Sequence, residues 1–167
     1  MRSERKFRGF SLVELVIVVV IIGVIAAIAV PRISRGAKGA GDASLRGSLA
    51  GLRNAIDMYA AEHGGTYPAA VTQALIEEKL LKTTDAQGNP GTILGTHIYG
   101  PYLRAGFPAA PVGANKGKST IKIVTGDPVA NAASEATGEG WIYSTDTGKI
   151  VINTDDTDES TVAYSTY

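Results

Sequence analysis

The chain has 167 residues, with 16 basic and 16 acidic side chains and a formal net charge of zero. This balance gives no sign of the basic surface that nucleic-acid-binding proteins carry, and we expect no nucleic-acid partner. The chain contains no cysteine, which excludes disulfide bonds and thiolate metal sites. Its length suffices for one membrane-spanning helix and one domain of ordinary size.

A short basic leader, residues 1–9, precedes an apolar segment, residues 10–30, that reads FSLVELVIVVVIIGVIAAIAV. Fifteen of these 21 residues are Phe, Leu, Val or Ile, and the only charge is Glu14. A helix that rises about 1.5 Å per residue would span roughly 31 Å over this length, which matches the hydrocarbon core of a bilayer. The segment therefore predicts a single membrane-spanning helix.

Glu14 is the unusual residue of this segment, because a carboxylate in a membrane helix is costly. The fifteen large apolar residues contribute roughly −7 kcal/mol to insertion, whereas an acid costs about 2.5 to 3.5 kcal/mol at the helix centre and less near an end. Insertion is therefore predicted despite Glu14. The residue either has a function in the membrane or extends its carboxylate to the interface.

The sequence around the start of the apolar segment, GFSLVEL at residues 9–15, has a distinctive arrangement. Gly9 precedes Phe10, and the acid Glu14 is the fifth residue counted from Phe10. A basic leader comes before this motif, and the apolar run that follows ends at Pro31. An ordinary secretory signal has a shorter apolar stretch with small residues after it. The arrangement resembles the prepilin processing motif of type IV pilins and type II secretion pseudopilins.

The resemblance implies that a prepilin peptidase cleaves between Gly9 and Phe10, and that Phe10 is then N-methylated. It also implies that Glu14 serves subunit assembly. In a bundle of such helices, the carboxylate of Glu14 could pair with the Phe10 ammonium of a neighbouring subunit. In a low dielectric an unpaired carboxylate is heavily penalised and a paired one much less so, which favours such a pairing.

The charges that flank the apolar segment do not fix its orientation. Four basic residues lie in the leader, and Arg32, Arg35 and Lys38 follow the apolar segment closely, so the positive-inside rule is nearly balanced. The resemblance implies instead that the protein is a single-pass protein of the bacterial inner membrane. The leader would then be cytoplasmic and the C-terminal domain periplasmic.

Residues 31–63 are predicted to continue the helix as an amphipathic segment. An apolar stripe recurs at spacings of four, three, four and three residues and is expected to face a core; it consists of Leu45, Leu49, Leu52, Ile56 and Tyr59. Pro31 is expected to break the helix, and Gly36, Gly39 and Gly41 should weaken it further. We thus expect one long helix from about Phe10 to His63 with a weak middle.

Residues 64–167 are predicted to form a globular head. Its expected elements are a short helix within residues 69–81, a loop at 85–92, a strand at 120–125 and a β-hairpin of residues 141–145 and 149–153. Gly148 should take the positive φ of the hairpin turn. Trp141, Tyr143, Ile150 and Ile152 would share the face toward the long helix. The predicted fold class is α+β, a long N-terminal helix packed against a small antiparallel β-sheet.

One acidic cluster, Asp155, Asp156 and Asp158, follows the hairpin. Closely spaced oxygen ligands suit Ca²⁺, and major pseudopilins, which this chain resembles, bind calcium in a C-terminal loop. The alternative is a solvated acidic turn, and no other cofactor is expected. His63 and His97 have no Cys, Ser or acidic residues around them in a catalytic pattern, so we predict that the protein is not an enzyme.

The predicted function is structural, as a subunit of a periplasmic pseudopilus that drives protein export by a type II secretion system. The absence of cysteine favours this over many type IV pilins, which have a C-terminal disulfide loop. The implied partners are further copies of the chain, minor pseudopilins, a prepilin peptidase, the inner-membrane secretion platform and the lipid bilayer. Two alternatives stay open: a type IV pilin for adhesion, motility or DNA uptake, and a single-pass anchored periplasmic binding or enzyme domain.

Overall fold

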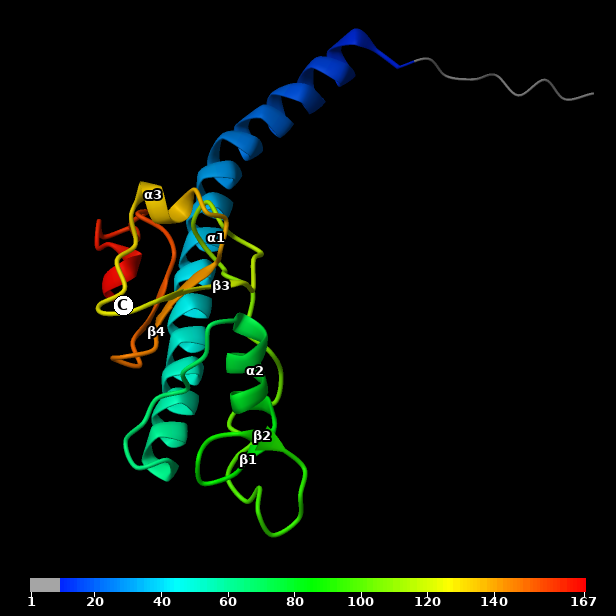
Figure 1. Cartoon of the computed structure of the whole chain (residues 1–167). Helices are drawn as coiled ribbons and strands as arrows, with labels where there is room; N and C mark the ends of the chain where they lie inside the picture. The colour runs from blue at the N-terminus through cyan, green and yellow to red at the C-terminus, as the bar shows by residue number, and fades with distance from the viewer. Residues whose placement is uncertain (1–9) are drawn as a thin grey trace, which may run out of the picture. The chain divides into compact units, whose positions relative to one another are not determined.

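The computed structural model describes residues 10–167, and the predicted leader, residues 1–9, lies outside them. Two units divide after Lys38, and α1 contributes to both. The elements follow in this order (Figure 1): α1 (Leu12–Glu62), α2 (Gln73–Leu81), β1 (Thr83–Thr84), β2 (Pro90–Gly91), β3 (Ile121–Val124), α3 (Ala132–Glu135), β4 (Trp141–Ser144), β5 (Ile150–Ile152) and the 3-10 helix η1 (Tyr164–Thr166). The α+β fold class is confirmed.

Helix α1 covers the predicted long helix, but Pro31 does not break it. The helix is continuous from Leu12 to Glu62 with Pro31 inside it, so the prediction of a break is wrong. Proline removes one backbone donor and crowds the carbonyl four residues earlier, yet the hydrogen bonds of the neighbouring turns remain. In apolar helices such a loss is commonly tolerated.

The glycines that follow Pro31 differ in their surroundings. A Cβ atom added at Gly36 or Gly39 would meet no heavy atom within 4 Å outside the helix. A Cβ atom added at Gly41 would lie only 2.9 Å from Cγ1 of Val112, which packs against α1 there. Gly41 is therefore favoured by close packing, because a Cβ atom there would displace Val112, whereas the other two only lower the helix propensity.

The C-terminal half of α1 buries the predicted stripe. Its five residues, Leu45, Leu49, Leu52, Ile56 and Tyr59, are at most 3% exposed. They form one apolar cluster with Ile76 and Leu80 of α2 and with the predicted hairpin residues Trp141, Tyr143, Ile150 and Ile152. Full burial of each large apolar side chain contributes about 1.5 to 3 kcal/mol, so this cluster is the core of the head.

The main sheet has the strand order β3-β4-β5 and is mixed. Strands β4 and β5 form the predicted hairpin, with Trp141 opposite Ile152 and Gly148 at a φ of 68° in the turn. Strands β3 and β4 are parallel, so the prediction of an antiparallel sheet is wrong for this pair. The connection, residues 125–140, is long enough to permit this, because parallel strands need a crossover of about a dozen residues or more.

Central strand β4 is buried on both faces. Trp141 and Tyr143 point into the core, where the indole N–H donates to the Pro108 carbonyl at 2.7 Å and the Tyr143 hydroxyl donates to the Pro68 carbonyl at 3.0 Å. Ile142 faces the other side, where it lines a cavity together with Val129 of the crossover. The two aromatic side chains thus bury their rings while their polar atoms stay hydrogen-bonded.

The connection between α1 and the sheet is more ordered than the sequence predicted. Helix α2 begins at Gln73, later than the predicted 69, because Thr72 caps it and accepts a hydrogen bond from the Leu75 amide at 3.4 Å. The predicted loop 85–92 includes β2, which pairs antiparallel with β1. The Asp85 carboxylate holds the intervening turn by accepting from the amides of Gln87 and Asn89.

A glycine comparison tests the hairpin turn. Gly148→Ala should cost about 2 to 5 kcal/mol of unfolding free energy, because it combines a positive φ with overlap between the new Cβ and the Tyr67 ring. Gly126 also has a positive φ, 78°, but open space around it, so Gly126→Ala should cost only about 1 to 2 kcal/mol. Denaturant titration of the detergent-solubilised chain, followed by Trp141 fluorescence, would measure both, and equal losses would contradict the packing of Tyr67.

Candidate functional site

The first turn of α1 contains a reciprocal hydrogen-bonded cap. Ser11 precedes the helix and its carbonyl accepts the first helical bond, from the Leu15 amide at 3.2 Å. The Ser11 hydroxyl accepts from the Val13 amide at 3.3 Å, and the Ser11 amide donates to Oε2 of Glu14 at 2.9 Å. This is a capping box, in which a serine and a glutamate three residues later satisfy backbone donors at a helix start.

The capping box gives Glu14 a role within its own subunit. One carboxylate oxygen accepts a backbone hydrogen bond, and the charge lies at the positive end of the helix dipole. Both effects reduce the cost of keeping a carboxylate in an apolar segment. The sequence reasoning missed this cap, although the pattern Ser-x-x-Glu before an apolar run would have indicated it.

The apolar surface of α1 before the head is uncovered. Large apolar side chains from Phe10 to Ile33 are 46–84% exposed. The most apolar 18-residue window of α1 has a mean hydropathy of 3.2, and none of it is buried. By length and composition α1 is therefore a candidate membrane anchor, with its apolar side chains available to lipid or to other helices.

The predicted processing residues fall at the edge of the described chain. Phe10 is the first described residue and is 84% exposed. Gly9 lies outside the described residues, so the cleavage of the Gly9–Phe10 bond and the methylation of Phe10 stay predictions. The structure places Glu14 one helical turn after Phe10, on the same uncovered segment.

The acidic cluster consists of one buried carboxylate and two exposed ones. Asp158 is buried, and its Oδ1 accepts from the amides of Ser160 and Val162 at 2.7 and 2.9 Å. Its Oδ2 accepts from the Tyr167 hydroxyl at 2.5 Å. Asp155 and Asp156 are exposed. Within residues 10–167 no three His, Cys, Asp or Glu side chains are placed to hold a metal ion, and protein donors occupy the one buried carboxylate of the cluster, so this geometry does not support the calcium prediction.

The two histidines lie at structural positions. His63 follows the end of α1 and stacks on Tyr59, with ring centroids 4.0 Å apart. Its Nδ1 lies 2.8 Å from the Tyr59 carbonyl and its Nε2 lies 3.0 Å from the Asp85 carbonyl, so the ring joins α1 to the loop after β1. His97 is half-buried beside Gly91.

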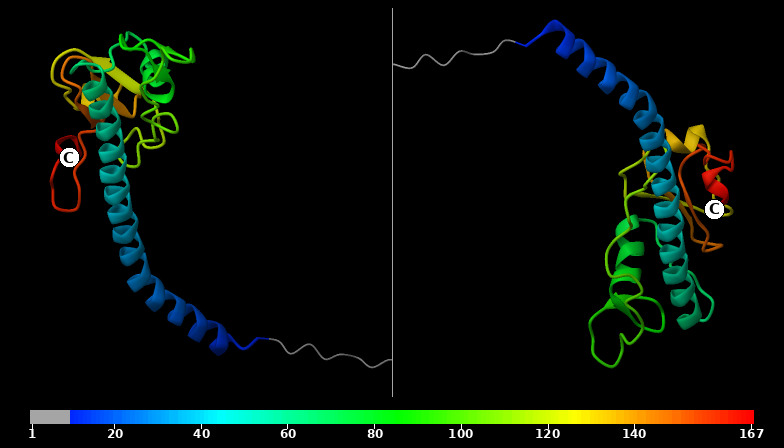
Figure 2. Two further views of the ribbon diagram at one scale, coloured as in Figure 1. Left: turned by 90° about the horizontal axis from the view of Figure 1, so that it is seen from below. Right: turned by 180° about the vertical axis from the view of Figure 1, so that it is seen from behind.

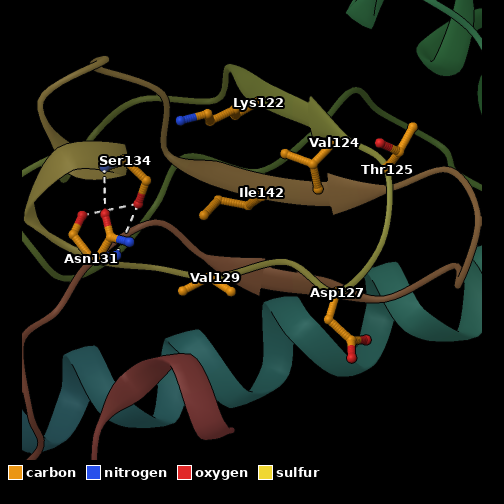
Figure 3. Close-up of a pocket in the computed structure, with 8 residues that line it drawn as sticks. All are labelled: Lys122, Val124, Thr125, Asp127, Val129, Asn131, Ser134 and Ile142. Carbon is orange, nitrogen blue, oxygen red and sulfur yellow. Dashed lines mark hydrogen bonds between the residues drawn. The ribbon is translucent and has the colours of Figure 1, made fainter.

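A cavity of about 350 Å³ lies on the face of the sheet opposite α1 (Figure 3). Its polar lining is largely committed to bonds within the protein. Asp127 forms an ion pair with Lys149, with 2.6 Å between Oδ1 and Nζ. The Ser134 hydroxyl lies 2.7 Å from Oδ1 of Asn153 and is also hydrogen-bonded to the Asn131 carbonyl. The cavity is thus a consequence of the crossover covering the sheet, and we assign it no ligand.

A model of the prokaryotic N-terminal methylation motif matches residues 5–30. The match covers three of the four basic residues before Gly9, together with the capping box and the apolar run. It supports a prepilin-type protein of the type IV pilin and pseudopilin class. No curated protein and no solved structure matches the chain.

The role of Asp158 can be tested through pH. Hydrogen bonds, first that of the Tyr167 hydroxyl, lower the pKa of Asp158 below its ordinary value of 3.8. A carboxyl with a lowered folded pKa stabilises the fold above its unfolded pKa, and this stabilisation is lost as the pH falls through the folded value. Asp158→Asn should therefore lower the melting temperature at pH 7 and reduce the loss of stability on acidification below about pH 4. Asp155→Asn, at an exposed position, should leave both unchanged.

Proposed function

We propose that this chain is a structural subunit of a periplasmic pseudopilus that drives protein export by a type II secretion system. The observation that carries the proposal is the methylation motif joined to an uncovered apolar helix. A helix that is apolar all round needs lipid or neighbouring helices to cover it. Further copies of the same helix would provide that cover in a filament, with the head outside the membrane.

Glu14 supplies the proposed register between subunits. The capping box occupies Oε2 of Glu14, whereas a carboxylate has a second oxygen that can accept from the Phe10 ammonium of a neighbouring subunit. Such a pair would form in a low dielectric, where charge-assisted bonds are strong and a shifted register would leave both charges unpaired. The cap and the intersubunit pair are therefore compatible in one structure.

The pseudopilus proposal extends to partners and location. Minor pseudopilins, a prepilin peptidase and the inner-membrane secretion platform would interact with the chain, which has its head in the periplasm and needs no catalytic group. The absence of cysteine supports a pseudopilin over the type IV pilins that use a C-terminal disulfide.

Deletion of the gene should abolish exoprotein secretion and leave twitching motility and DNA uptake intact. The reverse phenotype would identify a type IV pilin.

Processing is tested at Gly9. Gly9→Val should leave a full-length precursor in the inner membrane, because a peptidase acting at the membrane face needs a small residue before the cut. Gly9→Ala is the matched control and should still be processed. Intact-mass measurement and N-terminal sequencing of the purified membrane form would decide. Phe10 as the N-terminus of the Gly9→Val protein would contradict the assignment, and an uncut wild-type chain would favour a simple membrane-anchored domain.

Assembly is tested at Glu14 with variants that separate the charge from the cap. Glu14→Gln keeps an acceptor for the Ser11 amide but removes the charge, and Glu14→Leu removes both. Ser11→Ala removes the bond to Val13, worth about 1 kcal/mol, and keeps the charge. We expect sheared filaments in electron micrographs from Ser11→Ala and none from either Glu14 variant. Normal filaments from Glu14→Gln would mean that Glu14 acts as a cap only.

A further inference from the structure

After β5 the chain returns alongside α1 as a strap, residues 157–167 (Figure 2). The strap folds back on itself through an antiparallel bridge between Thr157 and Ala163, and it ends in η1. Asp158 closes the turn between the two arms, as described above. The strap was not predicted as an ordered element from the sequence.

The strap is tied to one face of α1 by three polar contacts. The Tyr164 hydroxyl donates to Oδ1 of Asp42 at 2.6 Å. Arg46 donates to the Tyr167 hydroxyl at 3.0 Å, and its guanidinium lies 4.7 Å from the centre of the Tyr167 ring. Arg53 donates to the main-chain oxygen of Tyr167 at 2.5 Å. Spacings of four and seven residues along α1 place these three partners on one face of the helix.

The strap is also held by the burial of its own side chains and by hydrogen bonds within it. Tyr164 is 3% exposed and belongs to the core cluster, and burial raises its pKa. The Tyr167 hydroxyl donates to Asp158 while it accepts from Arg46, so it links the turn of the strap to α1. Thr161 has a φ of 63°, which is strained for a β-branched residue and persists only where the surroundings fix it.

The position of these contacts on α1 is the decisive observation. The described side chains between Pro31 and Ala40 are exposed, Gly41 and Asp42 are the next along the helix and are half-buried, and Leu45 is the first that is fully buried. The strap therefore binds the first turns of α1 that belong to the head. Among the side chains that the structure describes, no other polar side-chain bond reaches Asp42 or Arg46.

We propose that the strap is a conformational device that fastens α1 to the head from Asp42 to Arg53 and, together with the packing of Val112 at Gly41, sets the point at which the helix becomes independent of the head. Opening of the helix at Gly36 and Gly39, where helix propensity is low, would then stop near Asp42 and not spread into the core. This inference concerns the isolated subunit and does not depend on the filament proposed above.

Hydrogen exchange of the full-length chain in detergent micelles tests the proposal. The double variant Tyr164→Phe/Tyr167→Phe keeps both rings and removes only the hydroxyls that reach Asp42, Arg46 and Asp158. We expect amides of residues 39–50 to exchange about tenfold faster, because local opening of α1 no longer has to break the two hydrogen bonds that the hydroxyls make to Asp42 and Arg46. Amides of β4 and β5 should keep their wild-type rates.

A matched control is available at the other end of the same helix. Tyr102 donates to Oε2 of Glu62 at 2.6 Å, so Tyr102→Phe removes an equivalent tyrosine–carboxylate bond to α1. It should speed exchange near residue 62 and leave residues 39–50 unchanged. Wild-type rates at residues 39–50 in the double variant would overturn the proposal. Equal acceleration throughout the head would overturn it too, since the strap would then be an ordinary part of the core.

Discussion

The burial of one apolar stripe of α1 against the sheet and α2 is the interaction on which the head depends. Leu49 and Ile56 contribute from the helix, and Trp141 and Tyr143 contribute from the central strand. The same helix has two kinds of surface, apolar all round before the head and apolar on one stripe within it. An apolar circumference requires lipid or other helices, whereas a stripe requires a single packed partner. The change from one pattern to the other along α1 therefore determines which surroundings each half of the helix requires.

Features that depend on local periodicity could be predicted from the sequence. The stripe of α1 and the β4–β5 hairpin are of this kind, because side-chain spacing and turn chemistry are encoded within a few residues. The parallel pairing of β3 with β4 is not encoded in this way. A strand pattern does not specify its neighbour, and a connection as long as residues 125–140 permits either a parallel or an antiparallel pair.

The candidate site likewise contains one feature that was evident from the local sequence and one that was not. The position of Glu14 in the apolar segment was evident from the sequence, and its local partner Ser11 lies three residues away in a recognisable motif. The role of Asp158 was not evident from the sequence, because charge spacing alone does not reveal which donors a carboxylate meets. Its partners are two backbone amides and a tyrosine nine residues later, and their convergence depends on how the strap folds. A cluster of acids in sequence is thus different from a cluster of free carboxylates in space.

The unequal surroundings of the three glycines after Pro31 matter for protein engineering. Alanine at positions 36 and 39 would meet open space and raise helix propensity by about 1 kcal/mol at each position. Alanine at position 41 would push Val112 away from α1 and offset that gain. A stiffened helix can therefore be designed without touching the head, by changing Gly36 and Gly39 and retaining Gly41. Such a chain would separate the contribution of helix pliability from that of subunit recognition.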